Sequence, residues 1–152
     1  MDKLDCRILD ALQNEFPLSE KPYEVLAGKL EISPSEFWGR VERLIEAGMI
    51  RRIGASLDSR KLGYSSTLAA VRVKTKLVEH AADVIGDYSE VTHSYLRDDN
   101  YNIWFTLIAS SPERIVEILE EIRSELSLKP GDVLNLPVER LFKLDARFKS
   151  PK

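Results

Sequence analysis

The spacing of apolar residues changes once along this chain, near residue 67, and this change constrains the fold more than any other feature. Before it, apolar side chains recur every three or four residues, as they do along the buried side of an amphipathic helix. After it, segments that alternate apolar and polar residues are interleaved with helical segments. We therefore expect an α+β protein with two domains, a helical domain over residues 1–62 and a second domain over residues 63–152.

Three short helices and a hairpin are predicted in the N-terminal domain. The first helix is expected to end at Pro17. The third has the clearest start signal, because Ser33 and Glu36 have the spacing of a capping box, and Gly48 follows its last turn. Residues 50–64 are predicted to form a β-hairpin, the wing of a winged helix-turn-helix domain.

The second domain is predicted to have the βαββαβ order of a ferredoxin-like fold over residues 67–138, followed by a basic C-terminal strand. Its central hairpin contains the turn-forming pair Asp99 and Asn100. If these two residues form the loop, Tyr95 lies opposite Trp104. A bulged loop with an odd number of residues would shift the pairing by one position and change every cross-strand neighbour.

The two faces of this hairpin differ in polarity. The more apolar face is expected to lie under the two helices, and it carries Thr92, Ser94, Leu96, Tyr101, Ile103, Phe105 and Leu107. The other face is expected to be open, and Arg72 joins it from the neighbouring strand. It carries Val91, His93, Tyr95, Arg97, Asn102, Trp104, Thr106 and Ile108.

Composition and charge exclude several classes of function. A single cysteine, Cys6, and two histidines cannot form an internal disulfide or complete a structural zinc site. No apolar run exceeds four residues, so we expect neither a membrane span nor a signal peptide, and a cytoplasmic location. Residues 1–50 contain six basic and ten acidic residues, a net charge of −4, so we do not expect DNA binding. Residues 51–62 and 137–152 each have a net charge of +3.

A helix-turn-helix joined to a βαββαβ domain resembles the leucine-responsive regulator/AsnC family over nearly the whole chain. The strings IRRIGA, LGY, VTHSYLR, YNIWFTL and LPVERLFKL resemble one specialised branch, the siroheme (sirohaem) decarboxylases of alternative heme and heme d1 biosynthesis. This resemblance implies a carboxy-lyase that removes carbon dioxide from the acetate side chains on rings C and D of siroheme. It also implies didecarboxysiroheme as product, no separate redox cofactor, and a related paralogous subunit that completes a heterodimer.

The resemblance gives the open face a candidate substrate site. His93 is either the axial ligand of the substrate iron or the acid that protonates the carbon left by a carboxylate. An arginine binds a carboxylate through two parallel hydrogen bonds, and an aromatic ring offers a flat apolar wall to a macrocycle. The candidate substrate-binding residues are Arg51, Arg52, Arg72, Tyr95, Arg97 and Trp104.

Simpler interpretations of the same residues stay open. A strand histidine is often satisfied by its neighbours, most arginines are solvated, and the aromatic residues suit a core or a subunit interface. Two other functions also fit the fold, an AsnC-type transcription regulator that senses a small ligand and a tetrapyrrole carrier without catalytic activity.

Overall fold

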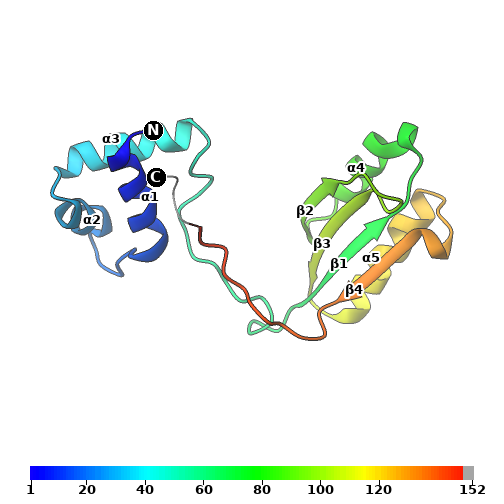
Figure 1. Cartoon of the computed structure of the whole chain (residues 1–152). Coiled ribbons are helices and arrows are strands. Elements are labelled where there is room, and N and C mark those ends of the chain that lie inside the picture. Colours follow the sequence, from blue (N-terminus) through cyan, green and yellow to red (C-terminus); the bar gives the residue numbers. More distant parts are fainter. Residues whose placement is uncertain (149–152) are drawn as a thin grey trace. The chain divides into compact units, whose positions relative to one another are not determined.

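The computed structural model describes residues 1–148 and contains two compact units (Figure 1). The first unit comprises residues 1–55 together with the C-terminal segment from Lys143, and the second comprises residues 56–142. The C-terminal segment therefore departs from the expected domain organisation. Residues 138–148 form no strand, and residues 143–148 group with the first unit.

The first unit is built from three helices, α1 (Lys3–Asn14), α2 (Pro22–Leu30) and α3 (Pro34–Glu46). Helix α1 ends three residues before Pro17, so the expected helix was too long, and the ring of Phe16 instead packs edge-on against Tyr23 at 6.0 Å. The apolar sides of the three helices meet in one core, made of Ile8, Ala11, Leu26, Ala27, Leu30, Phe37, Val41, Leu44 and Ile50.

The predicted boundaries of α3 are confirmed. The Ser33 hydroxyl accepts a hydrogen bond from the backbone N–H of Glu36 at 3.1 Å, and Gly48 has the positive φ of a residue that ends a helix. Only half of the capping box forms, because the Glu36 carboxylate accepts a hydrogen bond from the guanidinium of Arg40 at 3.2 Å.

The predicted wing hairpin is wrong. Residues 50–64 contain no β-strand, and the chain turns locally at residues 58–63. The Asp58 carboxylate accepts backbone hydrogen bonds from Arg60 and Lys61 at 3.2 and 3.4 Å. Such local side-chain bonds compete with a strand ladder, so the first unit is a helix-turn-helix without a paired wing.

The second unit has the predicted ferredoxin-like βαββαβ order. Its elements are β1 (Ser65–Val71), α4 (Val78–Gly86), β2 (Val91–Leu96), β3 (Ile103–Ala109), α5 (Pro112–Glu125) and β4 (Val133–Pro137). The strands form one antiparallel sheet in the order β2-β3-β1-β4 (Figure 1). Helices α4 and α5 pack on one face, where alternate residues of β3 are buried. The longest helix among residues 1–148 has 14 residues, and none of the described helices could cross a membrane.

Candidate functional site

The second face of the sheet has no helix of its own unit packed on it, and we call it the open face. The alternation of side chains defines its members, because Ala69, Val71, Ile103, Phe105 and Leu107 are buried on the helix side. The open face consists of Ser66, Leu68, Ala70, Arg72, His93, Tyr95, Arg97, Trp104, Thr106, Ile108, Leu134 and Leu136.

The predicted hairpin register is confirmed where it matters for this face. Tyr95 pairs with Trp104 and His93 with Thr106, and the Arg97 backbone N–H donates to the Asn102 carbonyl at 2.7 Å. The pairing continues through β1 and β4, so one row across the sheet consists of Tyr95, Trp104, Ala70 and Leu134.

A β-bulge, which the spacing of residues did not predict, breaks the register between Val91 and His93. Val91 pairs with Leu107 and packs against the helix-side core, so its predicted place on the open face is wrong. Thr92 is the extra residue, and it is exposed instead of lying under the helices. Leu96, also predicted under the helices, is 63% exposed because β2 is an edge strand.

Three side chains line up along β2 on the open face. The rings of His93 and Tyr95 are nearly parallel, with 6.3 Å between centroids and 18° between planes. The Arg97 guanidinium carbon lies 5.1 Å from the centroid of the Tyr95 ring, a cation–π contact. Within residues 1–148, Arg97 forms no ion pair, so its guanidinium can bind an external carboxylate.

Arg72 reaches the same face but is already engaged. Its Nε and one terminal nitrogen donate to the Asp132 carboxylate at 2.8 and 2.5 Å, and its guanidinium lies 5.6 Å from the centre of the Tyr101 ring. This ion pair raises the pKa of Arg72 and lowers the pKa of Asp132. Trp104 is also held in place, since its indole N–H donates to the Tyr101 carbonyl at 2.7 Å.

The structure thus brings together five of the seven predicted site residues. His93, Tyr95, Arg97, Trp104 and Arg72 share the open face. Arg51 and Arg52 are exposed and belong to the first unit, within the segment that was expected to form the wing. Sequence reasoning missed Thr92 and Asp132. The spacing of apolar residues holds no signal for either, because a bulge and an ion pair across 60 residues both depend on tertiary packing.

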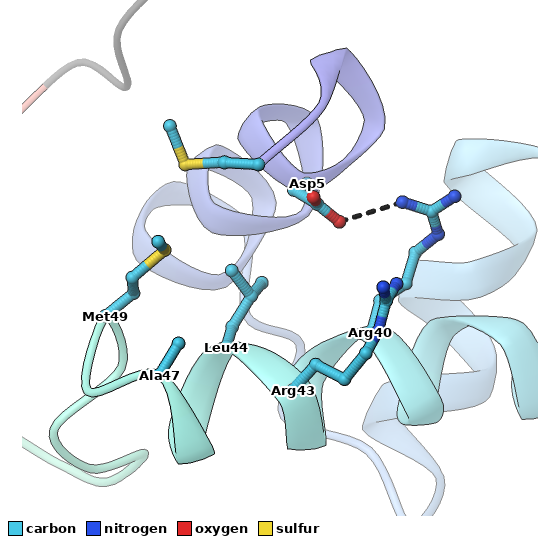
Figure 2. Close-up of a pocket in the computed structure, with 7 residues that line it drawn as sticks. Asp5, Arg40, Arg43, Leu44, Ala47 and Met49 are labelled. Atoms are coloured by element: carbon cyan, nitrogen blue, oxygen red, sulfur yellow. Dashed lines mark hydrogen bonds and ion pairs between the residues drawn. The ribbon is translucent and has the colours of Figure 1, made fainter.

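A small hollow lies elsewhere, between α1 and α3, as Figure 2 shows. Its volume of about 170 Å³ is well below the ~300–1,000 Å³ of pockets that enclose a cofactor-sized ligand. At its edge, Arg40 donates to the carboxylates of Asp2 and Asp5 at 2.7 and 2.8 Å. Arg40 lowers the pKa of Asp2 to about 2, and the backbone N–H of Asp2 lowers the pKa of Asp5. This hollow therefore belongs to an ionic cluster that fastens the N-terminus to α3.

Among residues 1–148, no cluster of three or more His, Cys, Asp or Glu side chains is placed to hold a metal ion. The chemistry that the open face offers is therefore one imidazole, one unpaired guanidinium and a wall of aromatic and aliphatic side chains.

Comparisons with known proteins place this chain in a family. Residues 5–51 match the family described as the siroheme decarboxylase NirDL-like HTH domain, and residues 61–143 match the AsnC-like ligand binding domain. The siroheme decarboxylase alpha subunit of Nitratidesulfovibrio vulgaris is 40% identical over 149 residues, covering 98% of this chain and 83% of that protein. The siroheme decarboxylase NirD subunit of Pseudomonas aeruginosa is 34% identical over 148 residues, covering 97% of this chain and 96% of that protein.

A solved structure is similar in both sequence and fold. The crystal structure of the siroheme decarboxylase NirDL in co-complex with an iron-uroporphyrin III analogue superposes with a TM-score of 0.69 at 31% identity. The match covers 99% of this chain and 48% of that chain, so this chain spans about half its length. With 34 to 40% identity to named subunits across almost its whole length, the chain belongs to the siroheme decarboxylase family.

Proposed function

We propose that this chain is one subunit of a siroheme decarboxylase and that its open face forms part of the siroheme site. The observation that carries the proposal is the alignment of His93, Tyr95 and Arg97 along one strand of an uncovered sheet face, in a member of this family. Trp104 lies directly opposite Tyr95 and adds a second aromatic surface.

The proposed reaction converts two acetate side chains of siroheme, on rings C and D, into methyl groups. In each conversion the bond between the methylene carbon and the carboxylate breaks, and carbon dioxide leaves. The bonding electron pair stays on the methylene carbon, where the conjugated macrocycle can delocalise it, until a proton forms the methyl group. No oxidant or reductant is consumed, and the product is didecarboxysiroheme.

His93 is the residue that we place at the reacting part of the substrate. Its Nδ1 lies 3.0 Å from the Thr92 hydroxyl, which leaves Nε2 pointing to other partners. Two roles fit this nitrogen, binding the substrate iron as an axial ligand or delivering the proton to the methylene carbon.

Arg97 is the residue that we assign to a peripheral carboxylate of siroheme. A strand advances ~3.3 Å per residue, so the Cα atoms of His93 and Arg97 lie about 13 Å apart, comparable to the width of a tetrapyrrole. Arg72 is less suited to this role because Asp132 already balances its charge. Arg51 and Arg52, which belong to the first unit, stay candidate carboxylate ligands from the sequence alone.

We also propose that a related subunit covers the open face. Leu68, Leu136 and Tyr95 are 42%, 44% and 49% exposed, which makes an apolar patch of a kind that monomers rarely leave in water. The named relatives are all subunits, and this chain spans half of one solved chain. Sedimentation of this chain with its paralogue is expected to give a complex. A stable monomer under all conditions would contradict a covered face.

The deciding experiment is anaerobic conversion of siroheme. This chain, mixed with its paralogous subunit and siroheme, is expected to yield a pigment lighter by two molecules of carbon dioxide in mass spectrometry. The matched control is Ser94→Ala, which removes a hydroxyl from the same strand on the opposite face and should leave conversion unchanged. Bound but unconverted siroheme would identify a carrier, and absence of any bound pigment would favour a regulator.

A further inference from the structure

The β-bulge on β2 brings together two side chains that a regular strand would separate. Adjacent residues of a strand point to opposite faces of the sheet. Thr92 and His93 are adjacent, yet the Thr92 hydroxyl lies 3.0 Å from Nδ1 of the His93 imidazole. The register shift between Val91 and His93 is what allows this contact, because a bulge can redirect a side chain.

The same hydroxyl has a second partner, the backbone carbonyl of Thr106. Thr92 Oγ1 lies 3.4 Å from the backbone carbonyl of Thr106, the residue paired with His93. A carbonyl oxygen can only accept a hydrogen bond, so in this contact the hydroxyl is the donor. A hydroxyl has one proton, and once it points to the carbonyl, only its oxygen lone pairs face the imidazole.

We infer that Thr92 is a positioning residue that fixes the tautomer of His93. If the Thr92 hydroxyl donates its proton to the Thr106 carbonyl, Nδ1 of His93 can hydrogen-bond to the Thr92 oxygen only as a donor. Nδ1 must therefore carry the ring proton. The lone pair of the neutral ring is then on Nε2, on the side away from Thr92. Hydrogen bonds of this kind set the tautomer of metal-binding and acid–base histidines in general.

This inference rests on the proposed function for its consequence but not for its geometry. An iron ligand needs the lone pair on Nε2. A proton donor that releases a proton from Nε2 returns to the same tautomer. In both roles of His93, therefore, Thr92 selects the nitrogen that acts on the substrate.

The first test is nitrogen-15 NMR of the chain alone, without siroheme. The chain has two histidines, and the variant His80→Gln leaves His93 as the only imidazole signal. In that background, at a pH where an ordinary imidazole is neutral, we expect a protonated Nδ1 and a bare Nε2. Thr92→Val keeps the shape of the side chain but removes the hydroxyl, and it should move the proton to Nε2. Thr92→Ser should restore the original pattern.

Three outcomes would overturn the inference: an Nε2-protonated ring in the parent protein, a Thr92→Val ring that keeps the parent pattern, or no rescue by Thr92→Ser. Should Thr92→Val fail to fold, as judged by its backbone amide spectrum, Thr92→Ala tests the same point because residue 92 is exposed. The matched control is Ser94→Ala, which removes a hydroxyl that does not face His93.

The second test uses the assembled enzyme. Removing a residue that orients a ligand or a catalytic group reduces activity by about 10- to 100-fold, so Thr92→Val should slow siroheme conversion by this factor and Thr92→Ser should recover it. Unchanged conversion by Thr92→Val would contradict the inference. If the parent complex converts no siroheme, the proposed function fails, while the NMR result still decides the role of Thr92.

Discussion

Replacing Arg97 by alanine is expected to weaken siroheme binding with little effect on saturated turnover. Arg97 directly follows β2, and its guanidinium carbon lies 5.1 Å from the centroid of the Tyr95 ring. In the proposed complex it binds a carboxylate at the edge of the macrocycle, about 13 Å along the strand from His93. Loss of this contact affects the bound substrate and the transition state equally, so it lowers affinity and leaves the chemical step intact.

The size of the effect follows from the chemistry of the contact. A hydrogen bond to a charged group contributes about 1.5–3 kcal/mol, which corresponds to roughly a 10- to 100-fold increase in Kd. Arg97→Lys keeps the charge but loses the planar guanidinium, so its Kd should lie between those of the unchanged protein and of Arg97→Ala.

Arg72 provides the matched control on the same face. Its guanidinium already donates twice to Asp132, so a substrate carboxylate would have to compete with that partner. Arg72→Ala should therefore change Kd by less than about threefold, as expected of an exposed ion pair with little net effect.

The assay is an anaerobic titration of the protein with siroheme, followed by the absorbance of the bound pigment and then by turnover at saturation. The reasoning would be refuted if Arg97→Ala left Kd unchanged. It would also be refuted if Arg72→Ala weakened binding as strongly as Arg97→Ala, because the Asp132 ion pair would then have no bearing on which arginine binds substrate.

Three further predictions address His93, the N-terminal ionic cluster and DNA. His93→Ala should either change the iron spectrum with a modest loss of rate, which identifies a ligand, or leave the spectrum and lower turnover by about 10²-fold or more, which identifies an acid. Because the pKa values of Asp2 and Asp5 are lowered in the folded state, their contribution to stability is present above about pH 4 and is lost as the pH falls through those lowered values. Thermal unfolding between pH 2 and 7 should follow this dependence, and Arg40→Met should lower the melting temperature near pH 7 and flatten the profile. Duplex DNA should bind this chain no more tightly than it binds an acidic control protein, because residues 1–50 carry a net charge of −4 and Arg40 is engaged by carboxylates. A salt-sensitive complex with nanomolar affinity for one operator would contradict this.

The features that could be predicted from the sequence are those whose physical causes are local. Ser33 caps α3 through a hydrogen bond to a residue three positions away, and the alternation along β3 follows from the two-residue period of a strand. The turn-forming pair Asp99 and Asn100 predicted the register that pairs Tyr95 with Trp104, and the structure has this register although residues 97–102 form a longer connection. The order of elements and the open face followed from these local signals.

Other features depend on partners that are distant in sequence. Asp132 neutralises Arg72 across 60 residues, and the Gln13 amide on α1 pairs with both backbone groups of Phe148 at 3.2 and 3.3 Å. Because of the first contact, the guanidinium of Arg72, a candidate substrate ligand, is already paired within the protein. The second groups the C-terminal segment with the helix-turn-helix, where a strand was expected.

The sequence by itself determined which residues could form a site, and tertiary structure decided how they act. The sequence of β2 and the residue after it placed an imidazole, a phenol and a guanidinium at alternate positions, which fixes them on one face of any regular strand. The bulge at Thr92 lies outside that rule, because it arises from the mismatch between two paired strands and leaves no trace in the period of the sequence. Only the folded sheet brings the Thr92 hydroxyl to Nδ1 of His93, and thereby leaves Nε2 as the nitrogen available to the proposed substrate.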